Sequence, residues 1–188
     1  MDTNVLEYFQ RVAKQWDTLR SNYYDESVIV KALEHAPIAK TQTVVDVGTG
    51  TGFVAAGLAP FARQVIGVDF SDAMLAVARE NMAKLGLTNV EFHQGTLQQL
   101  PLDDAFADVV VANMALHHAP DPVAALREMV RVCKPGGHVV ITDAMHHTFD
   151  WFRTELADVW LGFTRDEIEN WFGGAGLSSR RYELIGKR

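Results

Sequence analysis

Residues 44–52, Val-Val-Asp-Val-Gly-Thr-Gly-Thr-Gly, constrain the fold of this chain more than any other stretch. A run typical of a buried strand leads into Gly48, Gly50 and Gly52, and an apolar segment follows from Phe53. This order predicts a parallel strand, a tight turn and a helix whose N-terminus faces a ligand. Glycines in the turn permit positive φ angles and let the ligand lie against the main chain with no Cβ atom between them.

The spacing of the glycines distinguishes between two classes of ligand. Dinucleotide-binding folds carry Gly-x-Gly-x-x-Gly at this place, whereas here the third glycine comes one residue early and Phe53 follows it. Asp46 stands two residues before the first glycine, inside an otherwise apolar strand. A carboxylate is unfavourable beside a pyrophosphate and suits a ligand that carries a cation. The motif therefore argues against a nicotinamide-dependent oxidoreductase; the purely structural alternative is a glycine-rich turn beside a solvated Asp46.

The composition is that of an ordinary single-domain globular protein, with 48% apolar and 22% charged residues among 188. The formal net charge of −7 argues against nucleic-acid partners, because binding through phosphate contacts needs a basic face. No apolar run reaches the roughly 20 residues that span a bilayer, and the first residues lack the pattern of a secretory signal. The single cysteine, Cys133, excludes an internal disulfide. We therefore expect a cytoplasmic protein without membrane insertion.

Strand-like and helix-like runs alternate in the middle of the chain. After the strand at residue 44, further strands are predicted at 65–68, 90–93, 108–112 and 138–142. Ser71 and Asp121 are predicted N-caps of the helices between them, and Pro135-Gly136-Gly137 is predicted to turn the chain into the last of these strands. The alternation predicts an α/β fold with a doubly wound, mostly parallel sheet.

The two flanks of this region are expected to be mainly helical. Apolar residues at helical spacing predict one or two helices within 4–36, which Pro37 ends. A helix is expected at 149–161, and Thr164 with Glu167 predicts a capping box for another. A final strand is expected at 177–185.

Several polar residues follow the predicted strands, at the edge of the sheet where α/β proteins bind ligands. Asp69 ends the second strand, 21 residues after Gly48, and a carboxylate there can accept hydrogen bonds from both hydroxyls of a ribose. Combined with Asp46 and the shortened glycine motif, this acid predicts a ligand that carries both a ribose and a cation. The other strand ends supply Gly95-Thr96-Leu97, Asn113-Met114-Ala115 and Asp143.

Four motifs together resemble the class I S-adenosylmethionine-dependent methyltransferases, in the methyltransferase type 11 subgroup similar to the ubiquinone/menaquinone C-methyltransferases. They are residues 44–52, Val-Ile-Gly-Val-Asp-Phe-Ser at 65–71, Ala-Leu-His-His-Ala-Pro-Asp-Pro at 115–122, and Arg-Val-Cys-Lys-Pro-Gly-Gly-His at 131–138. Segments 16–20 and 160–163 are similar to methyltransferases associated with ArsR-type repressor domains. The resemblance implies a Rossmann-like methyltransferase sheet over 44–143, with S-adenosylmethionine as cofactor and S-adenosylhomocysteine as product.

The resemblance also implies a role for each part of the cofactor site. The glycine loop would hold the methionine moiety with Asp46 near its amino group, and Asp69 would take the ribose hydroxyls. Phe70 and Met74 would flank the adenine, and the chain from Asn113 would lie beneath the sulfonium. The predicted cofactor-binding residues are Asp46, Gly48, Thr49, Gly50, Asp69, Phe70, Met74, Gly95, Thr96, Leu97, Asn113 and Ala115.

Two departures from the family pattern carry consequences. Family members usually have an aspartate at the position of Thr96, so we expect a weaker contact with the adenine amino group here. The family sheet has seven strands, and this chain is about one strand short at its C-terminus. An uncovered strand edge invites pairing with another chain, which predicts a possible homodimer.

The acceptor side of the predicted site is rich in histidine. Methyl transfer from a sulfonium is an in-line displacement that needs alignment and, for a protonated acceptor, a base. The candidates for this base are His117, His118 and His147, and packing or capping is the alternative role for the first two. Asp143, His146 and His147 could form a metal triad on paper, but a fourth ligand at helical spacing is missing, so no metal is predicted.

Elimination leaves a small molecule as the expected methyl acceptor. Cys133 precedes the fifth strand, at the pole opposite the glycine loop, which argues against chemistry that gathers several thiols. The turn at 113–116 lacks the Asn/Asp-Pro-Pro-aromatic pattern that grips a flipped nucleic-acid base. We expect one domain over 1–188, with a helical lid at 1–40, a cofactor-binding core at 41–145, and C-terminal helices with the last strand at 146–188. The alternative function is a cofactor-binding regulatory module without catalysis.

Overall fold

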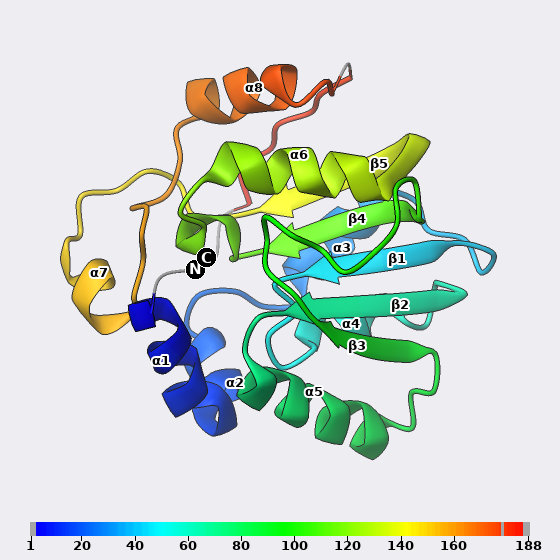
Figure 1. Ribbon diagram of the computed structural model, residues 1–188, viewed down its shortest axis with the longest axis horizontal. Helices are drawn as coiled ribbons and strands as arrows, with labels where there is room; N and C mark the ends of the chain where they lie inside the picture. The colour runs from blue at the N-terminus through cyan, green and yellow to red at the C-terminus, as the bar shows by residue number, and fades with distance from the viewer. Residues whose placement is uncertain (1–2, 178, 186–188) are drawn as a thin grey trace.

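The computed structural model describes residues 3–177 and 179–185, and its strands form one parallel sheet (Figure 1). The strands are β1 Thr43–Val47, β2 Gln64–Asp69, β3 Val90–Gln94, β4 Ala107–Asn113 and β5 Cys133–Thr142. Their order across the sheet is β3-β2-β1-β4-β5, with every pair parallel. The order reverses between β1 and β4, which is where open α/β sheets bind ligands. The predicted α/β fold with a doubly wound parallel sheet is confirmed.

Helices cover both faces of the sheet (Figure 1). The longer ones are α1 Thr3–Val12, α3 Ser27–His35, α4 Phe53–Leu58, α5 Asp72–Leu85, α6 Pro122–Val132 and α8 Arg165–Gly174. The short ones are η1 Ala13–Gln15, α2 Trp16–Arg20, η2 Leu116–His118 and α7 Trp151–Glu155. Across residues 3–177 and 179–185, no helix combines the length and the apolar character that crossing a bilayer requires.

The central strand β1 is buried along its whole length, which explains its nearly continuous apolar sequence. Val45 and Val47 pack in one core cluster with α6, whereas Val44 packs with α3 and α4 on the opposite face. Asp46 is the polar exception, and it is 1% exposed. A parallel strand covered on both faces thus delivers a buried carboxylate to the ligand-binding edge.

Three predicted helix starts are confirmed by their caps. Ser71 Oγ accepts a hydrogen bond from the Met74 N–H at the start of α5, and Asp121 Oδ1 accepts one from the Ala124 N–H at the start of α6. Thr164 and Glu167 form the capping box of α8. The starts of α5, α6 and α8 are therefore defined by hydrogen bonds to side-chain oxygens in or beside the first helical turn.

The N-terminal segment is more broken than predicted. Residues 4–36 contain three α-helices and the 3-10 turn η1 instead of one or two helices. The break lets α2 reach the glycine loop and α5 together: Asp17 accepts hydrogen bonds from the Thr51 hydroxyl at 2.8 Å and from the Asn81 amide at 3.1 Å. The hydrogen bonds of Asp17 with distant residues thus accompany a break in a segment whose apolar spacing alone would predict a continuous helix.

Two boundaries around β5 also differ from the prediction. The strand begins at Cys133 instead of residue 138, and the predicted Pro-Gly-Gly turn is an irregularity inside it: Ala107 pairs with Cys133, but Val109 pairs with His138. The helix predicted at 149–161 is reduced to α7, because the chain turns at Ala157 with a φ of +59°. Backbone N–H groups beyond that point bond to the carbonyl of His117.

The strand predicted at 177–185 is wrong for the described part of that segment, where residues 177 and 179–185 form no strand. Glu183 instead bonds to Lys31 at 2.7 Å and to His35 at 2.9 Å, both on α3. Side-chain contacts hold this segment, so β5 remains at the edge of the sheet. Pairing of that edge with a second copy of the chain stays a prediction.

Candidate functional site

The loop after β1 is the tightest part of the ligand-binding edge. Gly48, Gly50 and Gly52 have φ angles of +72°, +55° and +84°, as the motif predicts. The N–H groups of Gly48 and Thr49 both donate to the Val68 carbonyl, at 2.8 and 3.0 Å. A Cβ atom on Gly48 would lie 2.5 Å from the Cβ of Ala115, in the loop after β4. This glycine therefore lets two ligand-binding loops approach each other closely.

Asp46 holds the glycine loop onto α4. Its Oδ2 accepts hydrogen bonds from the Thr49 hydroxyl at 2.7 Å and from the Ala55 N–H at 3.1 Å. Burial raises the pKa of Asp46 to about 7, although both hydrogen bonds favour the ionised form. The side chain does not line the neighbouring cavity, so its contact with a ligand's amino group stays a prediction.

Asp69 occupies the corresponding place after β2. Its Oδ2 accepts from the Gly50 N–H and its Oδ1 from the Ser71 N–H, both at 2.9 Å. Burial raises the pKa of Asp69 to about 6, against the hydrogen bonds from these backbone groups. Unlike Asp46, it lines the cavity, so a ligand can reach its carboxylate.

A small cavity of about 50 Å³ lies where these loops meet. The structure brings together most of the predicted cofactor-binding residues around it: Gly48, Thr49, Gly50, Asp69, Phe70, Gly95, Thr96, Leu97, Asn113 and Ala115. Of the predicted residues, Met74 is buried in a separate cluster with Val5 and Tyr8 of α1 and does not line the cavity. It stands one turn into α5, where its side chain packs under α1.

Aromatic side chains cover the cavity. Phe9 of α1 contacts Phe70, Trp16 and His118 edge to face, with ring centroids 4.9 to 5.9 Å apart. Phe9 is one of the apolar residues at helical spacing within 4–36, and the sequence does not single it out because a core position and a cavity wall give the same pattern. Met114, a further lining residue, has a φ of +49° that its sequence does not reveal.

His117 and His118, the first two candidate bases, lie in a buried cluster with two carboxylates. His117 Nδ1 is 2.6 Å from Asp143 Oδ1, and its Nε2 is 3.6 Å from Asp158 Oδ1. Burial lowers the pKa of His117, but the charges of both carboxylates and the Asp143 hydrogen bond raise it, and the net shift is upward. Burial, followed by the charge of His117, lowers the pKa of His118 well below its usual value. Only His118 borders the small cavity.

Burial raises the pKa of Asp158 to about 6, although His117 favours its ionised form. Sequence reasoning missed this residue, because the predicted helix at 149–161 gave no reason to direct it toward η2.

His147, the third candidate base, lies apart from this cluster. It lines a larger open cavity of about 1210 Å³ along β5, and its ring packs 4.6 Å from that of Phe152. Its Nε2 is buried without a hydrogen-bond partner in the described residues. Burial, followed by the charges of His146 and His117, lowers the pKa of His147. Its Nδ1 accepts a hydrogen bond from the Phe149 N–H at 3.3 Å, so in the neutral ring the unpartnered Nε2 carries the hydrogen.

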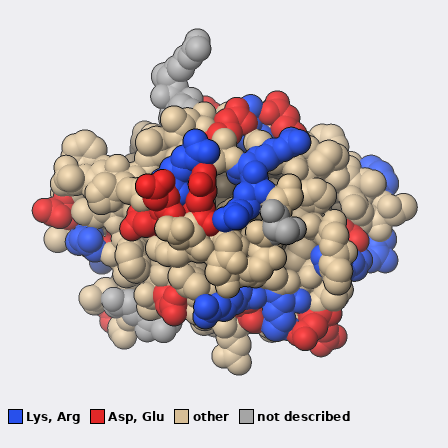
Figure 2. Space-filling model, turned by 90° about the horizontal axis from the view of Figure 1, so that it is seen from above, with Lys and Arg blue, Asp and Glu red and all other residues tan. Residues whose placement is uncertain are grey.

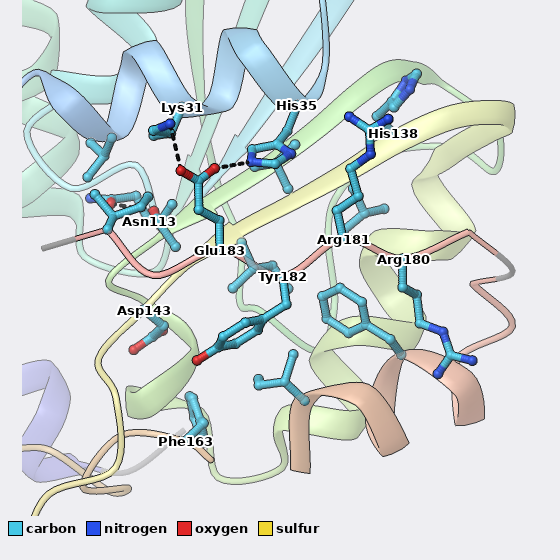
Figure 3. Close-up of a pocket in the computed structure, with 18 of the residues that line it drawn as sticks. Lys31, His35, Asn113, His138, Asp143, Phe163, Arg180, Arg181, Tyr182 and Glu183 are labelled. Atoms are coloured by element: carbon cyan, nitrogen blue, oxygen red, sulfur yellow. Dashed lines mark hydrogen bonds and ion pairs between the residues drawn. The ribbon is translucent and has the colours of Figure 1, made fainter. Parts of the chain in front are cut away.

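The larger cavity runs between β5, α3, α8 and segment 179–185. Figure 3 shows Lys31 and His35 reaching from α3 to Glu183 across it, while Phe163 lies on the opposite wall. Its ligand-edge end shares Tyr24, Asn113 and Met114 with the small cavity. The two cavities therefore meet at the end of β4.

The opposite end of the larger cavity carries Cys133, the first residue of β5. Because Cys133 pairs with Ala107 at the start of β4, it lies at the pole opposite the glycine loop, as predicted. On the face seen in Figure 2, basic and acidic side chains are interspersed. That face thus carries no purely basic patch of the kind that binds phosphate backbones.

The comparisons with known proteins agree with this geometry. The family model described as "Methyltransferase domain" matches residues 45–141. The methyltransferase YcgJ of Bacillus subtilis (strain 168) is 34% identical over 127 residues, which are 64% of this chain and 50% of YcgJ. The crystal structure of YcgJ superimposes with a TM-score of 0.73 at 28% identity, covering 80% of this chain and 68% of that one.

Two further relatives carry different substrate names. Arsenite methyltransferase of Halobacterium salinarum is 39% identical over 113 residues, 58% of this chain and 29% of that protein. Demethylmenaquinone methyltransferase of Shouchella clausii is 32% identical over 158 residues, 81% of this chain and 67% of that protein. The chain thus spans half or less of the length of YcgJ and of the arsenite enzyme.

Proposed function

The chain belongs to the methyltransferase domain family, and from this premise we propose that it transfers a methyl group from S-adenosylmethionine to a small-molecule acceptor. The observation that carries the proposal is the cavity at the β1–β4 reversal, which an accessible buried carboxylate and a glycine loop line together. Asp69 would accept hydrogen bonds from the ribose hydroxyls, beside the N–H groups it already holds. The buried Asp46 would add negative charge close to the cationic cofactor.

The acceptor is proposed to bind in the larger cavity. Because the two cavities share Asn113 and Met114, an acceptor there would lie next to the cofactor cavity. S-adenosylmethionine would supply the methyl carbon, whose bond to sulfur would break and leave its electron pair on sulfur as the bond to the acceptor forms. Alignment of the three atoms supplies most of the catalysis. His147 would take a proton from an acceptor that carries one through Nδ1, after release of the hydrogen bond that this nitrogen accepts from the Phe149 N–H.

We propose that the aromatic cover formed by α1, η1 and α2 is a lid. Pockets for ligands of this size usually measure about 300–1,000 Å³, whereas the covered cavity measures about 50 Å³. Phe9 and Trp16 must therefore move for the cofactor to enter. Limited proteolysis tests this: S-adenosylhomocysteine should slow cleavage within residues 3–25. Equal rates with and without it would leave these helices as structural cover.

Calorimetric titration with S-adenosylhomocysteine tests the cofactor site. Asp69→Asn removes charge-assisted hydrogen bonds and should weaken binding by about 2–4 kcal/mol, roughly 30- to 1,000-fold. Asp103→Asn, at an exposed position away from the cavity, is the matched control and should bind normally. Unchanged affinity in the Asp69 variant contradicts the assignment.

Transfer itself is tested with methyl-labelled S-adenosylmethionine and a panel of quinols, phenols, amines and thiols. Appearance of the label in an acceptor supports the proposal that the chain is a methyltransferase enzyme. Tight cofactor binding without label in any acceptor would indicate the alternative, a cofactor-binding module without catalysis.

A further inference from the structure

The cluster around η2 contains three side chains that can ligate a metal. His117 and His118 come from η2, and Asp158 reaches them from the segment after α7. One ring nitrogen of each histidine and one oxygen of Asp158 lie within 4.8 Å of one another, and all three residues are buried. His118 Nδ1 donates a hydrogen bond to the Ala157 carbonyl at 3.2 Å, because a carbonyl oxygen only accepts, so an ion bound through Nδ1 would replace that bond. The cluster borders the small cavity through His118.

The hydrogen bonds of Asp143 determine which nitrogen of His117 is available. Asp143 accepts from the Leu116 N–H at 2.9 Å and from the Ala144 N–H at 2.7 Å. A carboxylate that already accepts two N–H groups acts toward His117 as an acceptor also, so Nδ1 carries the hydrogen in their 2.6 Å contact. The Nε2 of a neutral His117 then presents a lone pair to Asp158 Oδ1, 3.6 Å away. Two acceptors that face each other need a cation between them, and that cation is either a proton shared by the pair or a metal ion.

The carboxylate of Asp158 lacks any other partner that would explain its position. The residue is 7% exposed, and in the described part of the chain no donor lies within hydrogen-bond distance of its side chain. The chain nevertheless directs it there: the preceding Ala157 has a φ of +59°, and the N–H groups of Val159 and Trp160 donate to the His117 carbonyl. The Asp158 oxygens, unlike His147 Nε2, are not fully enclosed, so solvent reaches them. Backbone strain beside such a carboxylate is typical of a functional constraint.

We propose that His117, His118 and Asp158 bind one divalent transition-metal ion of the zinc class. Two nitrogens and one oxygen suit zinc or cobalt, whereas magnesium and calcium prefer a shell of oxygens. Asp143 would orient His117 as the outer carboxylate of a carboxylate–histidine–metal arrangement. Three protein ligands leave the fourth tetrahedral position open to water or a ligand.

The ion would draw its ligands together. Bonds of about 2.0–2.2 Å at tetrahedral angles put ligand atoms roughly 3.3 Å apart, against the 3.6 Å between His117 Nε2 and Asp158 Oδ1. His118 Nδ1 lies 4.0 Å from Asp158 Oδ1 and would exchange its bond to the Ala157 carbonyl for the ion. This proposal differs from the sequence prediction of no metal, which considered Asp143, His146 and His147. It does not depend on methyl transfer.

Cobalt titration of the full chain, dialysed first against a chelator, tests the site. The wild type should bind one equivalent of Co²⁺ with the visible absorption of a tetrahedral complex, and Zn²⁺ should displace it. His117→Asn and Asp158→Asn each remove one ligand with little change in size, and should weaken binding at least 100-fold. Asp143→Asn should weaken it 10- to 100-fold. His146→Asn, at an exposed histidine nearby, is the control and should bind as the wild type does.

Two results would overturn the proposal. One is a wild type that shows no tetrahedral Co²⁺ absorption with excess metal; the cation between His117 and Asp158 is then a proton. The other is unchanged affinity in both ligand variants, whose folding is checked by circular dichroism. The Co²⁺ spectrum of the wild type can overturn the proposal by itself, so the test remains decisive even if a variant fails to fold.

Discussion

Buried carboxylates are held in two different ways along one edge of the sheet. After β1 and β2, Asp46 and Asp69 accept hydrogen bonds from N–H or hydroxyl groups of the loops and the helix start beside them, and one of these, from the Gly50 N–H to Asp69, joins the two loops. On the β4–β5 side, Asp158 faces two imidazoles at 3.6 and 4.0 Å and no donor in the described residues bonds to it. The first half of the site is preorganised by its own loops, whereas the second half is incomplete without a cation.

The largest expected effect tests how rigid the first half is. Gly48→Ala adds a Cβ atom 2.5 Å from that of Ala115 at a φ of +72°, and should lower the free energy of unfolding by about 3 kcal/mol. Gly86→Ala is the matched control, since Gly86 has a φ of +67° but no atom within 4 Å of the added carbon. It should cost about 1 kcal/mol. Urea denaturation measures both, and equal losses would show that the close approach of the loops contributes nothing.

The pH dependence of stability tests whether local hydrogen bonds fully offset the burial of charge. The pKa of Asp46 rises from 3.8 in the unfolded chain to about 7 in the fold, so the folded state binds more protons between these values. Stability is therefore highest at low pH within this window, and is lost as pH rises toward 7. Asp46 alone should lower the free energy of unfolding by about 2–3 kcal/mol between pH 5 and pH 8.

Asp46→Asn separates this contribution from those of other acids. The variant should show a smaller decline than the wild type in urea denaturation at pH 5 and pH 8. If both decline equally, Asp46 is ionised at no cost, and the two halves of the site differ less than the geometry indicates.

The smallest effect is expected from a substitution that adds a third carboxylate to the first half of the site. Thr96→Asp introduces the acid that related proteins usually carry at the adenine end. Thr96 lies on the cavity wall and is partly exposed, so the new carboxylate stays solvated and affinity for S-adenosylhomocysteine should remain equal or rise up to about tenfold. Calorimetry measures the change, and a marked loss would mean that the loop after β3 does not contact the adenine.

The same division explains what the sequence could predict. The glycine loop and the caps at Ser71 and Asp121 depend on residues a few positions apart, so their spacing reveals them. Asp69 is revealed by its place at the end of the second predicted strand. Asp158 meets His117 only because Ala157 turns the chain back toward η2, and helical periodicity cannot show such a turn. A strand is predicted at 177–185, but the ion pairs of Glu183 with α3 decide the path of the described residues there.

The aromatic cover has a kinetic consequence. Phe9 joins α1 to Phe70, Trp16 and His118 at once, so the cover cannot loosen at one contact without disturbing the others. If the cofactor passes beneath it, exchange requires a concerted opening whose rate belongs to the protein and not to the ligand. S-adenosylmethionine and S-adenosylhomocysteine would then leave at similar rates despite their different charge, and release of the spent cofactor would limit turnover.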